Sequence, residues 1–321
     1  MIIFSFKLNF ISMCIAVVMD LILGDPLWLP HPVIFIGKLI SRIEKYFRTK
    51  LKNEKLRIPG FIMVVTVAAL SFMIPFLILI ICSTNRYLYV AANSLILWTT
   101  LAARSLDKAG MEVYAPVAAK DIKEARKKLS YIVGRDTNSL SFKEIIRGDV
   151  ETIAENTSDG IIAPMIYGLI GGGAMSMMYK GINTMDSMVG YITEKFRYIG
   201  FFPAKTDDVF NYLPARVTGI LMCISAPMVK GSPAKALKIM IRDRKNHKSP
   251  NCAYPEAAAA GAMGIQLGGT NTYFGEVMVK PTMGDADVEL TEEHIKKTIR
   301  IMYCSEMLLL IIAAVILLIV H

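Results

Sequence analysis

Residues Ile58 to Cys82 read IPGFIMVVTVAALSFMIPFLILIIC, a stretch of 25 residues without a charged side chain. A helix that crosses the hydrocarbon core of a bilayer needs about 20 mainly apolar residues, so this stretch is long enough to span a membrane. The rest of the chain agrees, because 54% of its 321 residues are hydrophobic and only 20% are charged. This composition is too apolar for an ordinary soluble enzyme and predicts an integral membrane protein.

Three further apolar stretches are also expected to span, and each is interrupted by at most one acid: Leu8 to Gly24, Tyr87 to Ala103, and Met302 to Val320. The stretch Gly160 to Tyr179 contains a proline and three consecutive glycines, so it either spans or enters the membrane and returns.

The shorter Val217 to Val229 and the Ala- and Gly-rich Ala257 to Gly275 are expected to be buried or re-entrant. The polar stretch Arg104 to Asp159 has the spacing of amphipathic helices. We therefore expect an all-α integral membrane protein with about four to six membrane-embedded helices and helical cytoplasmic loops. No repeat or linker divides it, so residues 1–321 are expected to form a single domain.

The distribution of charge predicts the orientation in the membrane. Between Lys38 and Arg57 there are eight Lys or Arg residues and two Glu, whereas the loop after the next helix carries Arg86 alone. The positive-inside rule places the Lys38 to Arg57 loop in the cytoplasm. The net charge of +9 arises beside membrane helices and without interleaved aromatic residues, so we expect no nucleic-acid binding. The four histidines form no metal-binding pair, so zinc is not expected.

A first group of acids lies where the chain enters an apolar segment. Glu151, Glu155 and Asp159 are spaced i, i+4, i+8, which places three carboxylates on one helix face, with Asn156 beside them. A solvated helix end is the simpler explanation. Charge at the mouth of a membrane segment is costly unless it is paired or used, which favours a functional role.

A second group flanks a short polar loop. Asn183 and Asp186 are followed by Asp207, Asp208 and Asn211, with Arg216 just beyond. Carboxylate and amide oxygens suit Mg²⁺, which proteins usually hold with one or two carboxylates plus phosphate oxygens. The alternative is that these residues cap helices and solvate a loop. The expected metal ligands are Glu155, Asp159, Asp186 and Asp208.

The segment Gly264 to Gly275, GIQLGGTNTYFG, is expected to be a glycine-rich loop that approaches a ligand closely. No Gly-Lys-Ser or Gly-Lys-Thr follows, so it is not a Walker A loop. The alternative is that its glycines only permit tight packing. The candidate ligand-binding residues here are Gln266, Gly268, Gly269, Asn271 and Tyr273.

Long blocks of the chain, in this order, resemble the CobD/CbiB family of adenosylcobinamide-phosphate synthases. The blocks that carry the resemblance are MDLILGDPLWLPHPV from Met19, VGRDT from Val133, VETIAENTSDGIIAP from Val150, YKGINTMDSMVGY from Tyr179, DDVFNYLPARVT from Asp207, SPNCAYPEAAAAGAMGIQLGG from Ser249 and YFGE from Tyr273. Together they cover nearly the whole chain.

This resemblance implies ATP-dependent formation of an amide in cobalamin biosynthesis. The propionate carboxylate of adenosylcobyric acid would be joined to aminopropanol or its O-phosphate, by way of an acyl phosphate. It also implies a multi-pass protein of the cell membrane whose catalytic face is cytoplasmic, where ATP is found, and association with other cobalamin-assembly enzymes.

Such a reaction needs charge neutralisation at the phosphoryl group and a proton acceptor for the amine. The expected catalytic residues are Glu155, Asp207, Asp208 and Arg216. Asn156, Asp159, Asn183, Asp186 and Asn211 are expected to help bind ATP with Mg²⁺, and the glycine-rich segment to bind the corrinoid.

Two other classes of function fit parts of the pattern. A membrane transferase that uses Mg-diphosphate, such as a prenyltransferase, would use the acidic groups, but the repeated D-x-x-x-D form expected there is missing. A corrinoid transporter would use broken membrane segments as its site and would show internal pseudo-symmetry, which the sequence lacks.

Overall fold

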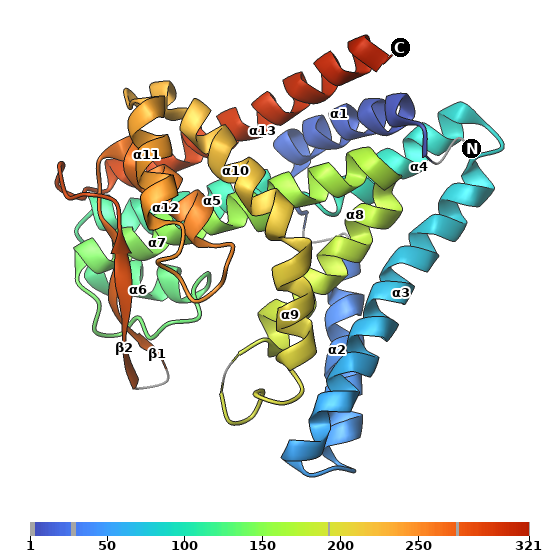
Figure 1. The fold of residues 1–321 in the computed structure, drawn as a ribbon, viewed down its shortest axis with the longest axis horizontal. Helices are drawn as coiled ribbons and strands as arrows, with labels where there is room; N and C mark the ends of the chain where they lie inside the picture. Colours follow the sequence, from blue (N-terminus) through green and yellow to red (C-terminus); the bar gives the residue numbers. More distant parts are fainter. Residues whose placement is uncertain (1–3, 27–29, 192, 274–275, 321) are drawn as a thin grey trace. The chain divides into compact units, whose positions relative to one another are not determined.

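A computed structural model describes residues 4–26, 30–191, 193–273 and 276–320 (Figure 1). Among these residues the chain is almost entirely helical, and its only sheet is one antiparallel pair of strands. This confirms the predicted fold class. The elements, in chain order, are α1 (Phe6–Leu23), α2 (Pro32–Arg48), η2 (Asn53–Leu56), α3 (Arg57–Cys82), α4 (Arg86–Trp98), α5 (Ala103–Ala118), α6 (Ile122–Ser130), α7 (Phe142–Thr157), the π turn η3 (Ser158–Ile162), α8 (Ala163–Val189), α9 (Phe201–Phe210), α10 (Tyr212–Ile224), η4 (Ala226–Val229), α11 (Pro233–Asp243), α12 (Ala253–Met263), β1 (Leu267–Tyr273), β2 (Glu276–Met283) and α13 (Glu293–Val320).

Four helical stretches of the described chain are long and apolar enough to cross a membrane: Phe6–Leu23, Asn53–Cys82, Phe142–Val189 and Glu293–Val320. They include the expected spans at α1, α3 and α13. In Phe142–Val189, 72% of the 18-residue apolar stretch is buried inside the protein. The corresponding share for the stretch that contains α3 is 22%, so Phe142–Val189 is mainly an internal helix.

The expected span from Tyr87 to Ala103 is shorter than predicted. Its helix α4 has 13 residues and ends at Trp98. At 1.5 Å per residue it is about 20 Å long, less than the hydrocarbon thickness of about 30 Å. Thr99 and Thr100 end it, because their hydroxyls donate to the carbonyls of Ile96 and Leu97 in the last turn.

The chain forms two compact units, each built from separate segments. Unit 1 comprises residues 1–102, 163–211 and 313–321, and unit 2 comprises residues 103–162 and 212–312. The boundaries lie at helix ends or inside α13 and not in a polar linker, so composition along the chain could not reveal them. The expectation of one domain over residues 1–321 stays a prediction.

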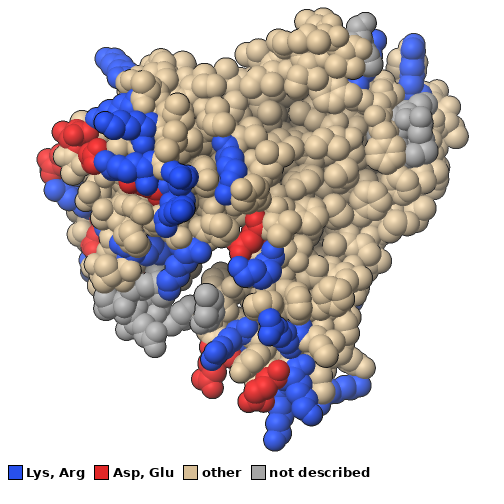
Figure 2. Space-filling model, in the orientation of Figure 1, with Lys and Arg blue, Asp and Glu red and all other residues tan. Residues whose placement is uncertain are grey.

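Unit 1 is organised around α3 and α8, which pack against each other. Their buried contacts include Met63 and Val67 from α3 and Ile182 and Met185 from α8. The outward face of α3 is apolar, and Figure 2 shows Lys and Arg side chains gathered at the end where α2 leads into α3. This is the pattern of a membrane helix with a basic loop at its end.

Helix α8 is broken where the sequence predicted weakness. Gly171 and Gly172 have non-helical backbone angles, and Gly172 has φ +64°, which favours glycine. The Gly173 N–H freed by the break donates to Asn93 Oδ1 at 2.7 Å. Asn93 Nδ2 in turn donates to Asn9 Oδ1 at 3.2 Å. A helix break in an apolar region is tolerated only where neighbours satisfy the backbone in this way.

Unit 2 contains the expected helices of the polar region as α5, α6 and α7. Helix α12 packs against α10 and α11 and is buried over almost its whole length, so the Ala-rich start of the segment Ala257 to Gly275 is a buried helix. The segment Gly264 to Gly275 does not form the expected glycine-rich loop. Residues Leu267–Tyr273 form β1, which pairs with β2, and Gly275 lies outside the described residues.

Gly268 and Gly269 have φ values of +81° and +84° at an irregularity in the β1 pairing. A Cβ on Gly268 would lie 2.4 Å from the Pro281 carbonyl oxygen, so a side chain there would collide with β2. The structure therefore supports the packing explanation for Gly268.

Candidate functional site

Unit 2 contains a polar cavity of about 220 Å³ enclosed by the loop after α6, helices α7 and α12, the segment after α11 and the hairpin. It is lined by Ile132, Val133, Gly134, Arg135, Glu151, Thr152, Glu155, Asn156, His247, Glu256, Gly268, Lys280 and Met283. Three acids and three basic side chains are thus brought to one enclosed space. We call it the acidic pocket.

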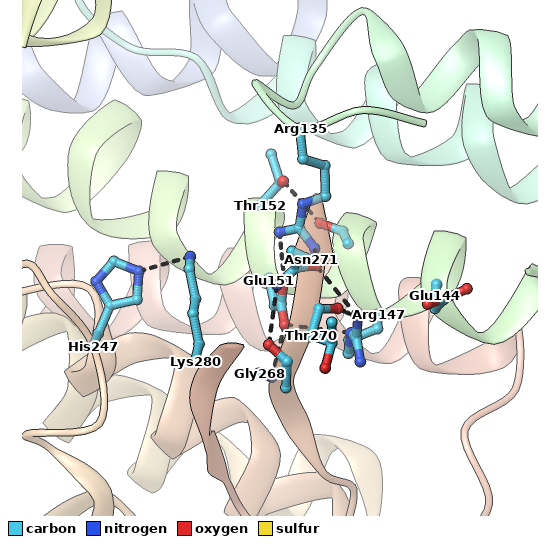
Figure 3. A network of polar contacts seen from close by, with 12 residues as sticks. Arg135, Glu144, Arg147, Glu151, Thr152, His247, Gly268, Thr270, Asn271 and Lys280 are labelled. Atoms are coloured by element: carbon cyan, nitrogen blue, oxygen red, sulfur yellow. Dashed lines mark hydrogen bonds and ion pairs between the residues drawn. The ribbon is translucent and has the colours of Figure 1, made fainter. Parts of the chain in front are cut away.

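A buried ion pair forms one wall of the acidic pocket. Arg135 Nη2 lies 2.5 Å from Glu151 Oε2, and the side chains are 8% and 7% exposed. The other carboxylate oxygen, Oε1, accepts the Gly268 N–H at 2.8 Å. Figure 3 shows Arg135 reaching across to Glu151 and to Asn271. Both oxygens of Glu151 are therefore engaged, which makes this acid a positioning residue for Arg135.

Asn271 on β1 accepts hydrogen bonds from two arginines at one side-chain oxygen. Its Oδ1 accepts hydrogen bonds from Arg135 Nη1 at 2.7 Å and from Arg147 Nη2 at 3.3 Å. The residue is 3% exposed. The structure thus places Asn271 behind the pocket wall, where it orients guanidinium groups.

Two acids of the acidic pocket remain open to a ligand. Glu155 Oε1 accepts a hydrogen bond from Cys252 Sγ at 2.9 Å, and within the described chain its Oε2 accepts none. Glu256 is 4% exposed and makes no hydrogen bond to the residues that the structure describes. Burial, with Glu151 and Glu155 nearby, raises the pKa of Glu256 well above its usual value. A buried carboxyl with a raised pKa is suited to proton transfer near neutral pH.

His247 and Lys280 lie together on another side of the acidic pocket (Figure 3). The Ser249 N–H donates to His247 Nδ1 at 3.0 Å, and His247 Nε2 lies 3.2 Å from Lys280 Nζ. Burial and the nearby Lys280 lower the pKa of His247, which favours the neutral imidazole. The lysine supplies positive charge opposite the carboxylates.

In unit 1 the structure brings together three of the predicted residues. Asp207 accepts hydrogen bonds from Asn211 Nδ2 at 3.0 Å and from Asn183 Nδ2 at 3.4 Å, one at each carboxylate oxygen. Tyr179 donates to Asn211 Oδ1 at 2.7 Å. Asn211 is 2% exposed and Asp207 9% exposed, so this cluster is nearly closed to solvent.

The other predicted residues of this region have different surroundings. Asp208 pairs with the exposed Lys205 at 2.9 Å, and Asp186 lies near the end of α8. Arg216, which belongs to unit 2, lies between the rings of Tyr212 and Tyr254, 3.4 and 4.4 Å from their centres. It also donates to Asn251 Oδ1. These contacts orient the guanidinium group outside the acidic pocket.

The four expected metal ligands are divided between the two units. Glu155 and Asp159 belong to unit 2, and Asp186 and Asp208 to unit 1. Among the described residues, no group of three or more His, Cys, Asp or Glu side chains is arranged to hold a metal ion. The metal assignment stays a prediction.

The remaining predicted residues of unit 2 lie at several different places. Asn156 lines it, although its Nδ2 donates to the Thr152 carbonyl of its own helix. Gln266 is exposed at a separate surface cavity, and Gly269 lies against Arg147. Tyr273 ends β1, and its side chain lies outside the described residues.

Comparison with known proteins gives the family. The sequence model of the CobD/CbiB protein family matches residues 13–302. The chain belongs to the CobD/CbiB family. It is 59% identical to the cobalamin biosynthesis protein CobD of Clostridium acetobutylicum over 307 residues, which are 95% of this chain and 98% of that protein. It is 46% identical to the cobalamin biosynthesis protein CbiB of Salmonella typhimurium over 305 residues, 94% of this chain and 96% of that protein. No solved structure matches it.

The CobD/CbiB blocks contained several pocket residues to which sequence reasoning assigned no role. Arg135 lies in VGRDT, and Glu256 lies in the block from Ser249. The sequence could have indicated Glu256, because it is a single acid directly before the uncharged stretch that begins at Ala257. A charged residue in such a position usually has a functional role. Lys280 and His247 carried no such signal, since their proximity arises only from the fold.

Proposed function

We propose that this chain is a cobalamin-biosynthesis enzyme that forms the amide between the propionate carboxylate of adenosylcobyric acid and aminopropanol or its O-phosphate, with ATP as co-substrate. The observation that carries the proposal is the match to the CobD/CbiB family over residues 13–302, together with relatives named cobalamin biosynthesis proteins. The acidic pocket supports it with side chains that suit this chemistry.

The size of the acidic pocket limits what it can hold. Sites for drug-sized ligands occupy about 300 to 1,000 Å³, and this cavity of about 220 Å³ is smaller. It therefore suits the small amine or the reacting groups alone, and the corrinoid ring would remain outside it. Positive charge from Arg135 and Lys280 would attract a carboxylate or a phosphoryl group to the pocket.

The proposed reaction has two chemical steps. A carboxylate oxygen of the corrinoid bonds to the γ-phosphorus of ATP as the bond to ADP breaks, which gives an acyl phosphate. The amine nitrogen then bonds to the acyl carbon, phosphate leaves, and the ammonium proton passes to a base. Glu256 is our candidate for that base, because its raised pKa makes its carboxylate a stronger proton acceptor.

Magnesium would accompany ATP and neutralise phosphate charge. Glu155 fits a role as one of its ligands, because its Oε2 accepts no hydrogen bond from the described residues, and Mg²⁺ needs only one or two protein carboxylates when phosphate is present. Asp159, in the turn that follows Glu155 in the chain, is a second candidate. Asp207 and Asp208 are retained as candidates for ligands of Mg-ATP or for the general base, and Arg216 as a candidate for neutralising charge on the phosphoryl group.

We further propose that the protein resides in the cell membrane with its catalytic residues on the cytoplasmic side. Four helical stretches of the described chain have the length and apolarity to cross a membrane. The basic loop between α2 and α3 favours the cytoplasm by the positive-inside rule. ATP is available on that side.

The direct test is a product assay. Purified full-length protein is incubated with adenosylcobyric acid, ATP and either aminopropanol or its O-phosphate, and the corrinoid products are analysed by mass spectrometry. We expect an ATP-dependent amide product with at least one of the two amines. No product with either amine, in protein shown to be folded, would reject the proposed function.

The assay also tests the acid assigned from sequence in unit 1. If Asp208 is a ligand of Mg-ATP or the general base, Asp208→Asn should insert and fold normally but lose about 100-fold in kcat. Lys205→Gln removes its ion-pair partner and is the matched control. Turnover of Asp208→Asn within about threefold of wild type would remove Asp208 from the catalytic residues.

A further inference from the structure

A second cavity of unit 2 is basic and lies beside the acidic pocket. Its volume is about 520 Å³. It is lined by Lys123, Arg126, Lys127, Ser130, Arg135, Asp136, Thr137 and Asn138. Four basic side chains thus face one cavity with a single acid, and we call it the basic pocket.

The spacing of residues on α6 creates one side of the basic pocket. Lys123, Arg126, Lys127 and Ser130 follow the i, i+3, i+4, i+7 pattern, which places them on one helix face. Arg126 Nε donates to the Leu140 carbonyl at 2.8 Å, which fixes its guanidinium group against the loop after α6. These basic groups therefore line the cavity as a set.

Two acids lie near this face among the described residues: Asp136 lines the same cavity, and Glu124 belongs to α6. Lys127 lies 3.7 Å from Glu124, a long and exposed pair. Lys123 is exposed, and its ammonium group makes no ion pair or hydrogen bond with the described residues. Exposed pairs of this kind contribute little, so the positive charge remains available to an anion.

Arg135 is common to the two pockets. It lines both cavities, and its side chain is 8% exposed. Glu151 and Asn271 fix its orientation from the side of the acidic pocket. A planar guanidinium group held in this way can form paired hydrogen bonds to phosphate oxygens. An anion in the basic pocket would therefore lie next to the reacting groups.

We propose that the basic pocket binds substrate phosphate, either the polyphosphate of ATP or the phosphate ester of the amine. This inference rests on the proposed function, since it assigns a place to one of that reaction's substrates. The volume supports it, because about 520 Å³ lies within the usual range for small-molecule sites, whereas the acidic pocket falls below that range. Phosphate in the basic pocket would then lie beside the reacting carboxyl, with Arg135 lining both cavities.

The test compares two double variants of the full-length protein in lipid nanodiscs. Lys123→Gln/Lys127→Gln removes two charges from the basic pocket, and both side chains are exposed, so folding should be preserved. Lys108→Gln/Lys128→Gln is the matched control, because it removes two exposed or half-buried charges from α5 and α6 outside the cavity. Calorimetric titrations with inorganic tripolyphosphate, ATP and aminopropanol O-phosphate give the Kd values.

We expect the pocket variant to raise Kd by about tenfold or more for at least one phosphate ligand, and the control by no more than about twofold. Weaker tripolyphosphate and ATP binding with unchanged aminopropanol O-phosphate identifies the nucleotide as the source. The reverse pattern identifies the amine phosphate. Unchanged affinity for all three, or equal weakening in the control, overturns the proposal.

Failure of this proposal can be distinguished from failure of the proposed function. Wild-type protein that forms the amide product, paired with a pocket variant of unchanged phosphate affinity, would reject the basic pocket alone. Wild-type protein that forms no product, although the pocket variant weakens tripolyphosphate binding, would reject the reaction and leave the phosphate site in place.

Discussion

Unit 1 and unit 2 both contain buried polar side chains, but they use them differently. In unit 1, Asn93 satisfies the broken helix α8, and the two oxygens of Asp207 accept hydrogen bonds from neighbouring amides. In unit 2, Glu256 and one oxygen of Glu155 face a cavity without a hydrogen bond from the described residues. A buried polar group whose capacity is used by its neighbours stabilises the fold, whereas one left open can act on a ligand.

The comparison therefore predicts different consequences of substitution in the two units. Open groups of unit 2 should affect turnover more than stability, and engaged groups of either unit should affect stability. The buried pair of Arg135 and Glu151 belongs to the engaged class although it lies in unit 2.

The largest effect is expected at this buried pair. Arg135→Gln leaves the Glu151 carboxylate buried without its main partner, which typically costs about 3 to 5 kcal/mol. Thermal unfolding in detergent should show a clearly lower midpoint. In the double variant Arg135→Gln/Glu151→Gln the unpaired charge is removed and Gly268 keeps an acceptor, so most of the loss should be recovered.

Lys143→Gln is the control for the pair, because it breaks an ion pair with Glu289 whose partners are 67% and 70% exposed. It should leave the midpoint unchanged. A midpoint of Arg135→Gln equal to that of Lys143→Gln would show that the buried pair is not an engaged structural element.

The next largest effect is expected at Glu256. Glu256→Gln keeps the shape of the side chain and removes its ability to accept a proton, so kcat should fall about 100-fold or more. Stability should not fall, because Glu256 makes no hydrogen bond to the described residues and its raised pKa favours a neutral side chain in the folded protein, as in Gln. Glu289→Gln, a surface acid of the same unit, serves as control. Turnover of Glu256→Gln within about threefold of that control would exclude Glu256 as the base.

A smaller effect is expected at Asn93 in unit 1, where stability and not turnover should change. Asn93→Ala removes the acceptor of the Gly173 N–H and leaves that group buried, at a cost of about 1 to 3 kcal/mol. The unfolding midpoint should drop, while kcat per folded molecule stays unchanged. Loss of turnover at unchanged stability would contradict the division between the two units.

The smallest effect is a dependence of stability on pH. The folded protein raises the pKa of Glu256 above its ordinary value near 4.5, so the folded state keeps this proton where the unfolded state loses it. The stabilisation is complete below the ordinary pKa and is lost as pH rises through the raised one. The drop in unfolding midpoint from about pH 5 to about pH 8 should therefore be larger for wild type than for Glu256→Gln. Equal drops would show that Glu256 does not titrate in this way.

Sequence reasoning succeeded where the signal is local. The uncharged run of α3, the weak point at the glycine triplet of α8, and the placement of Glu151 and Glu155 on one helix all follow from residues within a few turns of each other. These features depend on hydrophobic length, backbone freedom and helical periodicity, which can be read from neighbouring residues.

It failed where the fold brings distant segments together. Glu155 meets Cys252 across 97 positions, and Arg135 meets Asn271 across 136. The segment with Asn271 was predicted as a loop because glycine and polar residues dominate it, yet pairing with β2 makes it a strand. Tertiary context overrode the local preference, and it also placed Asn271 in hydrogen bonds with two arginines from distant segments, Arg135 and Arg147.

The break in α8 also bears on how the protein is made. Asn9 lies in α1 and Asn93 lies in α4, so both are synthesised before the glycine triplet emerges from the ribosome. The acceptor for the Gly173 N–H is therefore already available when α8 is synthesised. A chain with the order of these helices reversed would expose that amide to lipid until its partner arrived, at a cost of several kcal/mol. The order of translation thus protects the weakest point of the longest internal helix.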